Sequence, residues 1–261
     1  MKTKILILAV FTCFSFYACA QSDVSLNKTD KTGNKTGHWI KKYPNGKIMY
    51  DGIFRDNHPV GKFSRYDDKG NLESVLIFSD DGSEADATMY YPGGKVSSTG
   101  KYFNRQKEGT WKFYSSFDGY LICEENYDHN LRNGLSRKFY PDSTLAESVK
   151  YVNDRMQGEW RQYYPDGQLS QVSHYNEGKA TGKFQAWFED GTPSVTGQYE
   201  NDLRNGKWLI YKPDGSVKYE VNYVNGIPTN NQMELDDEKY LDSLENNKGK
   251  IADPEKTGII K

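Results

Sequence analysis

The chain has few side chains of the kinds that carry catalysis or bind metals. Its four histidines occupy different positions of the sequence repeat described below, so repetition does not assemble a metal site from them: His38, His58, His129 and His174. It contains no Ser-His-Asp order, phosphate-binding loop or dinucleotide fingerprint. Carboxylates are plentiful but fall in turns, where capping and solubility account for them; a glycosidase pair is the enzymatic alternative. We therefore expect no catalytic residues, no metal and no cofactor.

The first twenty residues predict export. Two lysines precede an apolar run, residues 5–16, which is the layout of a bacterial secretory signal and is too short to cross a bilayer as a mature helix. Two cleavage sites compete. An A-x-A site ends at Ala20, whereas "FYAC" resembles a lipobox in which Cys19 becomes the lipidated first residue. Both place the protein outside the cytoplasm, either secreted or held at the cell envelope by a lipid anchor.

The composition argues against a nucleic-acid partner and against disulfide bonds. The net charge of -2 over 261 residues gives no basic surplus for phosphate, so we expect no nucleic-acid partner. Cys123 is the only cysteine beyond the signal, which excludes a disulfide framework. Its place in the repeat predicts a buried, unreactive thiol.

A repeat of 24 residues runs from Gly37 to Thr229. Its eight units begin at Gly37, Gly61, Ala85, Gly109, Gly134, Gly158, Gly182 and Gly206, with one inserted residue in "SSFDG" of the fourth unit. We number positions within a unit as columns, counting the first residue as zero and allowing for that insertion. Column seventeen is aromatic in all eight units: Phe54, Phe78, Tyr102, Tyr127, Tyr151, Tyr175, Tyr199 and Tyr223.

The turn chemistry predicts one β-hairpin per unit. Columns seven to nine read "PNG", "PGG" or "PDG" in four units and "PDS" in a fifth. Proline and glycine at these places favour a type I turn with a G1 bulge, in which the glycine is left-handed. The strand that follows alternates apolar and polar residues, as in "SVKYEVNY". A single hairpin is marginal in water, so the units must stabilise one another by stacking.

We therefore predict an all-β fold: an elongated, single-layer, twisted antiparallel sheet of eight stacked 24-residue hairpins. The predicted boundaries are a signal peptide over 1–20, a polar tether over 21–36, the repeats over 37–229 and a polar tail over 230–261. The tail contains a possible short helix that would cap the last sheet edge. We expect Lys248 to Lys261 to be disordered.

The G-x-W, Y-Y-P-D-G and alternating-strand pattern resembles the MORN variant repeat across all eight units. That family includes bacterial YwqK-type proteins named as antitoxins. The resemblance implies a long sheet of successive hairpins and a protein without a transferable set of catalytic residues. It also implies lipid or protein binding, since related repeats have been linked to both.

Column two holds the main candidate binding residues. Six units have a ring there, a ladder formed by Trp39, Phe63, Trp111, Trp160, Phe184 and Trp208, while Ala87 and Ser136 are the exceptions. A three-residue tip would put columns five, eleven, thirteen, fifteen and seventeen on one face and columns two and six on the other. The ladder would then be either a platform for an extended glycan or peptide, or packing that supports a thin sheet. The uninterrupted run in the last three units predicts that a ligand binds there.

Basic residues in columns three and four form a second pattern. They are Lys41, Arg65, Lys112, Arg137, Lys138 and Arg161. A stripe of this kind is usually a solvated face, and an anionic ligand is the alternative. We thus expect an exported, non-catalytic scaffold that binds a protein or a glycan. The alternatives are a cytoplasmic antitoxin and, less favoured, a carbohydrate-active enzyme.

Overall fold

The computed structural model describes residues 25–230 and 235–246. Cys19, the remainder of the predicted signal, and the segment from Lys248 to Lys261 lie outside the described residues. Within the described ranges the chain forms one antiparallel sheet of 21 strands and one helix. The strands are β1 (Lys28–Thr29), β2 (Lys35–Lys42), β3 (Ile48–Arg55), β4 (His58–Tyr66), β5 (Leu72–Phe78), β6 (Glu84–Tyr90), β7 (Val96–Phe103), β8 (Gln106–Tyr114), β9 (Leu121–Asp128), β10 (Leu131–Arg132), β11 (Gly134–Phe139), β12 (Leu145–Val152), β13 (Arg155–Tyr163), β14 (Leu169–Asn176), β15 (Lys179–Ala180), β16 (Gly182–Trp187), β17 (Pro193–Glu200), β18 (Leu203–Arg204), β19 (Gly206–Tyr211), β20 (Val217–Val224) and β21 (Ile227–Pro228); the helix is α1 (Leu235–Asn246).

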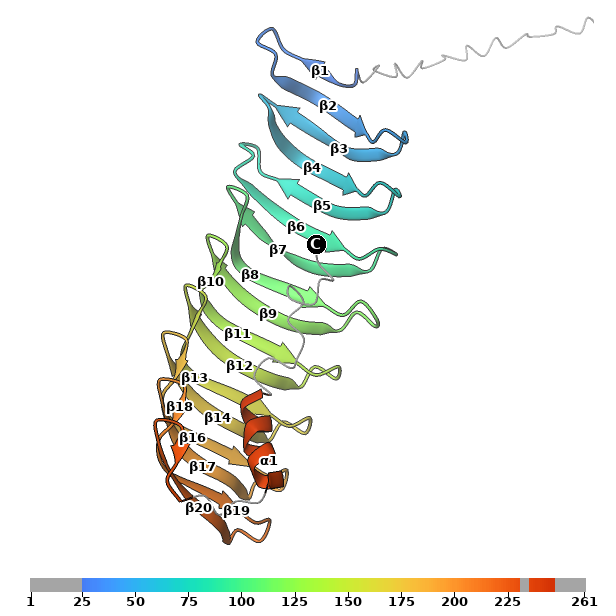
Figure 1. The fold of residues 1–261 in the computed structure, drawn as a ribbon. Helices are drawn as coiled ribbons and strands as arrows, with labels where there is room; N and C mark the ends of the chain where they lie inside the picture. Colours follow the sequence, from blue (N-terminus) through green and yellow to red (C-terminus); the bar gives the residue numbers. More distant parts are fainter. Residues whose placement is uncertain (1–24, 231–234, 247–261) are drawn as a thin grey trace, which may run out of the picture.

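The strands pair in chain order along an elongated, twisted sheet (Figure 1). Each hairpin pairs with the next, and the short strands β10, β15 and β18 extend the junctions between units. The predicted fold of successive antiparallel hairpins is confirmed. In the first tip, Tyr43 and Gly46 close the turn, and Gly46 has a φ of 83°, a conformation open to glycine without steric cost.

Besides the G1 bulge predicted at the tip, every hairpin carries a second β-bulge that the turn motif did not predict. In the last hairpin Tyr211 pairs with Val217 but Ile210 pairs with Tyr219, so Lys218 is an additional residue. The same register shift occurs in all eight hairpins. Side chains alternate between the two faces of a sheet, so one extra residue in a strand moves every later side chain of that strand to the opposite face relative to its partner strand.

The predicted division of the rings between two faces is therefore wrong. Columns two and four lie on the same face as columns thirteen, fifteen and seventeen, and we call it the ring face. On it the rings of Trp208 and Tyr223 lie 6.1 Å apart, and those of Trp208 and Tyr199 lie 5.1 Å apart. Cys123, in column thirteen, is 1% exposed, which confirms its predicted burial.

Column fifteen of one unit lies beside column two of the next; three of these pairs combine a glycine with a ring, whereas Val149 pairs with Trp160. A Cβ atom on Gly100 would lie 2.2 Å from the Trp111 ring, so only glycine leaves room for the indole. The same contact joins Gly52 with Phe63 and Gly197 with Trp208.

Complementary size also explains the two units without a column-two ring. Ala87 pairs with Leu76, a large residue in column fifteen. Glu124 pairs with Arg137, which places Glu125, also large and in column fifteen, beside Ser136. At both exceptions a large column-fifteen residue therefore lies beside the small column-two residue.

The two ends of the sheet differ from the predicted boundaries. β1 lies inside the predicted polar tether. Side-chain contacts hold this segment against β2: the Trp39 indole donates to the carbonyl of Lys28 (2.9 Å), and Asn27 bonds to the backbone of Ile40. The predicted helix in the tail is present as α1. It lies across the ring face of the last units instead of capping the sheet edge (Figure 1).

Candidate functional site

The ring face is buried at its C-terminal end and open at its N-terminal end. The column-seventeen rings of units four to eight are all buried, whereas those of the first three units, Phe54, Phe78 and Tyr102, are half-buried. The column-two rings follow the same gradient: Trp111, Trp160, Phe184 and Trp208 are at most 2% exposed, while Trp39 and Phe63 are half-buried. Four of the six ladder residues therefore present no ring face to solvent.

The helix α1 covers the C-terminal units where we expected a ligand. Leu241 is 1% exposed and belongs to the same buried cluster as Val195 and Trp208. Polar contacts surround this anchor: Arg204 bonds to Glu245 (2.8 Å) and Asp242 (3.1 Å), Tyr240 to Ser194 (3.2 Å), and Lys218 to Asp237 (2.8 Å). On the ring face, α1 therefore occupies the place that the sequence prediction assigned to a ligand.

A hollow of about 700 Å³ opens on the uncovered half of the ring face, over strands β4 to β7. Its apolar lining includes Phe63, Leu76, Phe78, Ala85 and Tyr102. The hydroxyl-bearing residues Ser74 and Ser97, which are 3% and 2% exposed, also line it. Exposed charged side chains complete it: Arg65, which pairs with Glu73 at 3.4 Å, and Arg105.

Two departures from the repeat coincide at this hollow. One is Ala87, which lacks the column-two ring; Ala87 is itself buried outside the lining, whereas Leu76, which pairs with it, lines the hollow. The other is Arg105 in column twenty, where Asn57, Asn130, Asp154 and Asp202 accept the backbone N–H of the preceding unit in their own junctions. A guanidinium cannot accept a hydrogen bond, so Arg105 does not replace that function. Its φ of 65° is also better suited to asparagine.

The other unit without a column-two ring is filled from within. Beside Ser136, the buried Glu125 carboxylate accepts a 2.5 Å hydrogen bond from the Tyr127 hydroxyl. Arg132 lies 3.8 Å from Glu125 and 4.1 Å from the centre of the Tyr151 ring. The unit with Ser136 in column two therefore borders a buried polar network, whereas the unit with Ala87 in column two borders the hollow.

The predicted basic stripe is divided between the two faces, because columns three and four point to opposite sides of the sheet. Lys138 lies on the ring face and pairs with the buried Glu147 at 3.0 Å. Lys112 and Arg137 lie on the reverse face and both pair with Glu124. These three basic residues thus each form an ion pair with a neighbouring strand.

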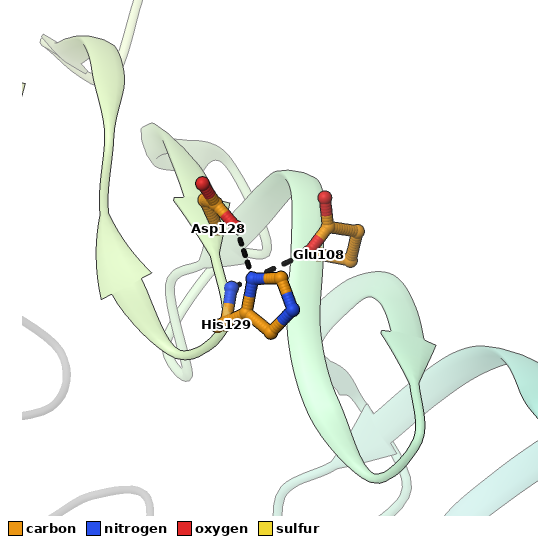
Figure 2. A group of neighbouring side chains, drawn as sticks. All are labelled: Glu108, Asp128 and His129. Atoms are coloured by element: carbon orange, nitrogen blue, oxygen red, sulfur yellow. Dashed lines mark hydrogen bonds and ion pairs between the residues drawn. The ribbon is translucent and has the colours of Figure 1, made fainter.

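Among the residues that the structure describes, one group of side chains could hold a metal ion. Ligand atoms of Glu108, Asp128 and His129 lie within 4.8 Å of one another (Figure 2). Its histidine is already engaged: Asp128 contacts the His129 Nδ1, and this hydrogen bond raises the pKa of His129 and lowers the pKa of Asp128. Because a metal requires neutral histidine, this exposed ion pair competes with metal binding.

Sequence reasoning missed a row of tyrosines in column six. Their hydroxyls donate to the backbone carbonyl of column five in the next unit, at 2.7–2.9 Å, and they are Tyr43, Tyr91, Tyr140 and Tyr164. The second tyrosine of the repeated "YY" before the tip proline is the column-six residue, and its recurrence could have indicated this row. The row ties successive hairpins together along one edge and is structural.

Comparisons with known proteins agree with the repeat. Three segments, residues 35–56, 156–177 and 204–225, match the MORN repeat variant. A search of curated proteins finds no match to the chain. Among solved structures, similar ones include TarM, at 14% identity, and a point mutant of S. aureus TarM in complex with fondaparinux, alpha-GlcNAc-glycerol and UDP, at 13% identity. Each similarity covers 37% of this chain and 19% of the other, with a TM-score of 0.29.

Fold and repeat together define a β-hairpin repeat scaffold. Within the described residues, the single helix is not long and apolar enough to cross a membrane.

Proposed function

We propose that the protein is an exported, non-catalytic scaffold of the cell envelope that binds another macromolecule on the open half of its ring face. The hollow over β4 to β7 carries this proposal, because it is apolar, partly lined by charge and left uncovered by α1. Sites with an apolar lining and a few convergent polar groups are the usual places for ligand binding. The secretory pattern of the first twenty residues supports export.

Site-specific photocrosslinking in the producing cell tests where partners bind. A photoreactive amino acid at Phe63, on the ring face, should give discrete crosslinked products. The matched control is Ile77, which lies on the reverse face of the same sheet region and is 49% exposed. Equal products from both positions, or products from Ile77 alone, would contradict a binding site on the ring face.

Cell fractionation and lipid labelling test the proposed location. The mature chain should be recovered from the envelope, and a fatty-acid probe should label the wild type but not Cys19→Ala. An unlabelled wild type beginning at Gln21 would instead support the secreted form. A full-length chain with an intact signal in the cytoplasm would support the antitoxin alternative.

A further inference from the structure

The rings around the hollow indicate the shape of its occupant. Elsewhere on the ring face, a column-seventeen ring lies between two column-two rings: Phe54 contacts Trp39 and Phe63, and Tyr199 contacts Phe184 and Trp208. These contacts are mostly edge-to-face, the preferred geometry of aromatic pairs.

At the hollow this alternation is broken. Phe78 contacts Phe63 edge-to-face at 6.2 Å, and Tyr102 contacts Trp111 at 4.9 Å. The ring that would lie between Phe78 and Tyr102 is absent because column two is Ala87 here. Both Phe78 and Tyr102 line the hollow, so an external ring placed there would complete the series.

The charges at the hollow indicate a second group on the occupant. Asp67, Glu73 and Arg65 lie toward the hairpin tips, where Arg65 is paired with Glu73. Arg105 stands at the opposite, junction end. A guanidinium binds a carboxylate through two parallel hydrogen bonds, so a carboxylate of the occupant fits the junction end.

We propose that this hollow binds a peptide segment of a partner protein through one aromatic side chain, in place of the missing column-two ring, and one neighbouring carboxylate that pairs with Arg105. This proposal rests on the proposed binding function and names the chemistry of the partner. A peptide fits better than a glycan because an aromatic side chain between Phe78 and Tyr102 would reproduce the ring-to-ring contacts that Tyr199 makes with Phe184 and Trp208.

The test uses the full chain and three acetylated, amidated pentapeptides as probes. The first has the sequence Gly-Trp-Gly-Glu-Gly; the second replaces Trp by Leu, and the third replaces Glu by Gln. Binding is followed by titration of the Met89 methyl signal in NMR spectra, because Met89 lines the hollow. We expect the first probe to bind, and the other two to bind about tenfold more weakly each, the scale of a charged hydrogen bond or an aromatic contact.

Two variants restore the repeat and should abolish the site without harming the fold. Leu76→Gly with Ala87→Trp rebuilds the glycine–tryptophan pair seen at Gly100 and Trp111, which fills the hollow. Arg105→Asn restores the usual column-twenty residue. Both should lose at least about tenfold in affinity while keeping the wild-type melting temperature. Arg155→Asn, a remote exposed arginine, is the matched control and should bind normally.

The outcomes separate the possibilities. If Arg105→Asn and the Gln probe bind as well as wild type and the Glu probe, the proposal is overturned, even if the double variant does not fold. A Met89 shift with chitopentaose but not with the peptides would replace the peptide by a glycan, and concentration-dependent dimerisation blocked by the double variant would replace it by a second copy. Each of these failures leaves the envelope location and the ring-face crosslinks of the proposed function intact.

Discussion

At the scale of single residues, the column-two rings are packing groups, and two of the tryptophans also donate their indole N–H to the preceding unit. The indole N–H of Trp111 donates to the carbonyl of Lys101 at 3.1 Å, and that of Trp208 donates to Gln198 at 3.2 Å. Each acceptor lies in the preceding unit. Trp111 and Trp208 therefore join two hairpins through both the ring and the N–H, whereas the buried indole N–H of Trp160 has no partner within the described residues.

Truncating such a ring should destabilise the fold. Trp160 is completely buried, so Trp160→Ala should lower the free energy of unfolding by about 3–5 kcal/mol, the range for removing a large buried aromatic. Urea unfolding followed by circular dichroism measures this loss. A change below about 0.5 kcal/mol, as for an ordinary surface residue, would mean that the ring is not part of the core.

The glycines beneath the rings should be equally intolerant of change. Gly100→Ala would place a methyl group 2.2 Å from the Trp111 ring, so we expect a loss of about 1–3 kcal/mol from overpacking. The control is Lys101→Ala, an exposed neighbour, which should change stability little. If Gly100→Ala matched the control, close packing would not explain the glycine.

At the scale of elements, hydrogen-bonded turn aspartates make the stability of several hairpins depend on acid pH. The pKa of Asp142 and that of Asp190 are lowered mainly by a hydrogen bond from the backbone N–H of the threonine two residues later. The pKa of Asp214 is lowered mainly by a hydrogen bond from the side chain of Ser216. In the junction turn, hydrogen bonds from Ser79 and then Ser83 lower the pKa of Asp81 to about 2.

These shifts predict a loss of stability in acid. Because the pKa of these aspartates in the folded chain is below their ordinary value of 3.8, the unfolded chain binds more protons as the pH falls. Their stabilisation is complete above the unfolded pKa and is lost as the pH falls through the folded values, toward about 2. Melting temperatures measured between about pH 5 and pH 2 should fall, and the fall should be smaller in Asp81→Asn. An equal fall in that variant would show that Asp81 does not contribute.

The helix is the second element whose contribution can be measured. Leu241→Ala removes its buried anchor and should cost about 2–5 kcal/mol of helix docking. Hydrogen exchange should then rise in α1 and in β16 to β19 beneath it. Lys239→Ala, at an exposed position of the same helix, is the control. Unchanged exchange in Leu241→Ala would mean that α1 is not held by this contact.

At the scale of the whole molecule, packing is unequal along the sheet. One buried cluster joins units five to eight and α1, a smaller one lies around Trp111 and Cys123, and the rings of the first two units are only half-buried. Repeats interact mainly with their neighbours, so such a gradient favours stepwise unfolding.

We therefore expect the N-terminal units to unfold first. Hydrogen exchange in increasing urea should release β2 to β5 before β13 to β17, and probes at the two ends should report different midpoints. Coincident midpoints at both ends would contradict this prediction and indicate that the sheet unfolds as one unit.

The sequence by itself determined the repeat, the hairpin tips and the elongated sheet, since each depends on local turn chemistry and on alternation along a strand. It also determined that the rings of column seventeen and Cys123 pack inward. The tail helix was readable from its local pattern as well.

Only the tertiary structure decided which rings share a face, because one bulged residue per hairpin reverses that relation and leaves no distinctive residue type in the sequence. It likewise decided that α1 covers the C-terminal units, since docking depends on contacts between segments distant in the chain, such as Leu241 with Val195. The hollow arises in the same way: Ala87 and Arg105 are separate exceptions in the sequence, and the pairing of β4 to β7 brings their consequences to one place.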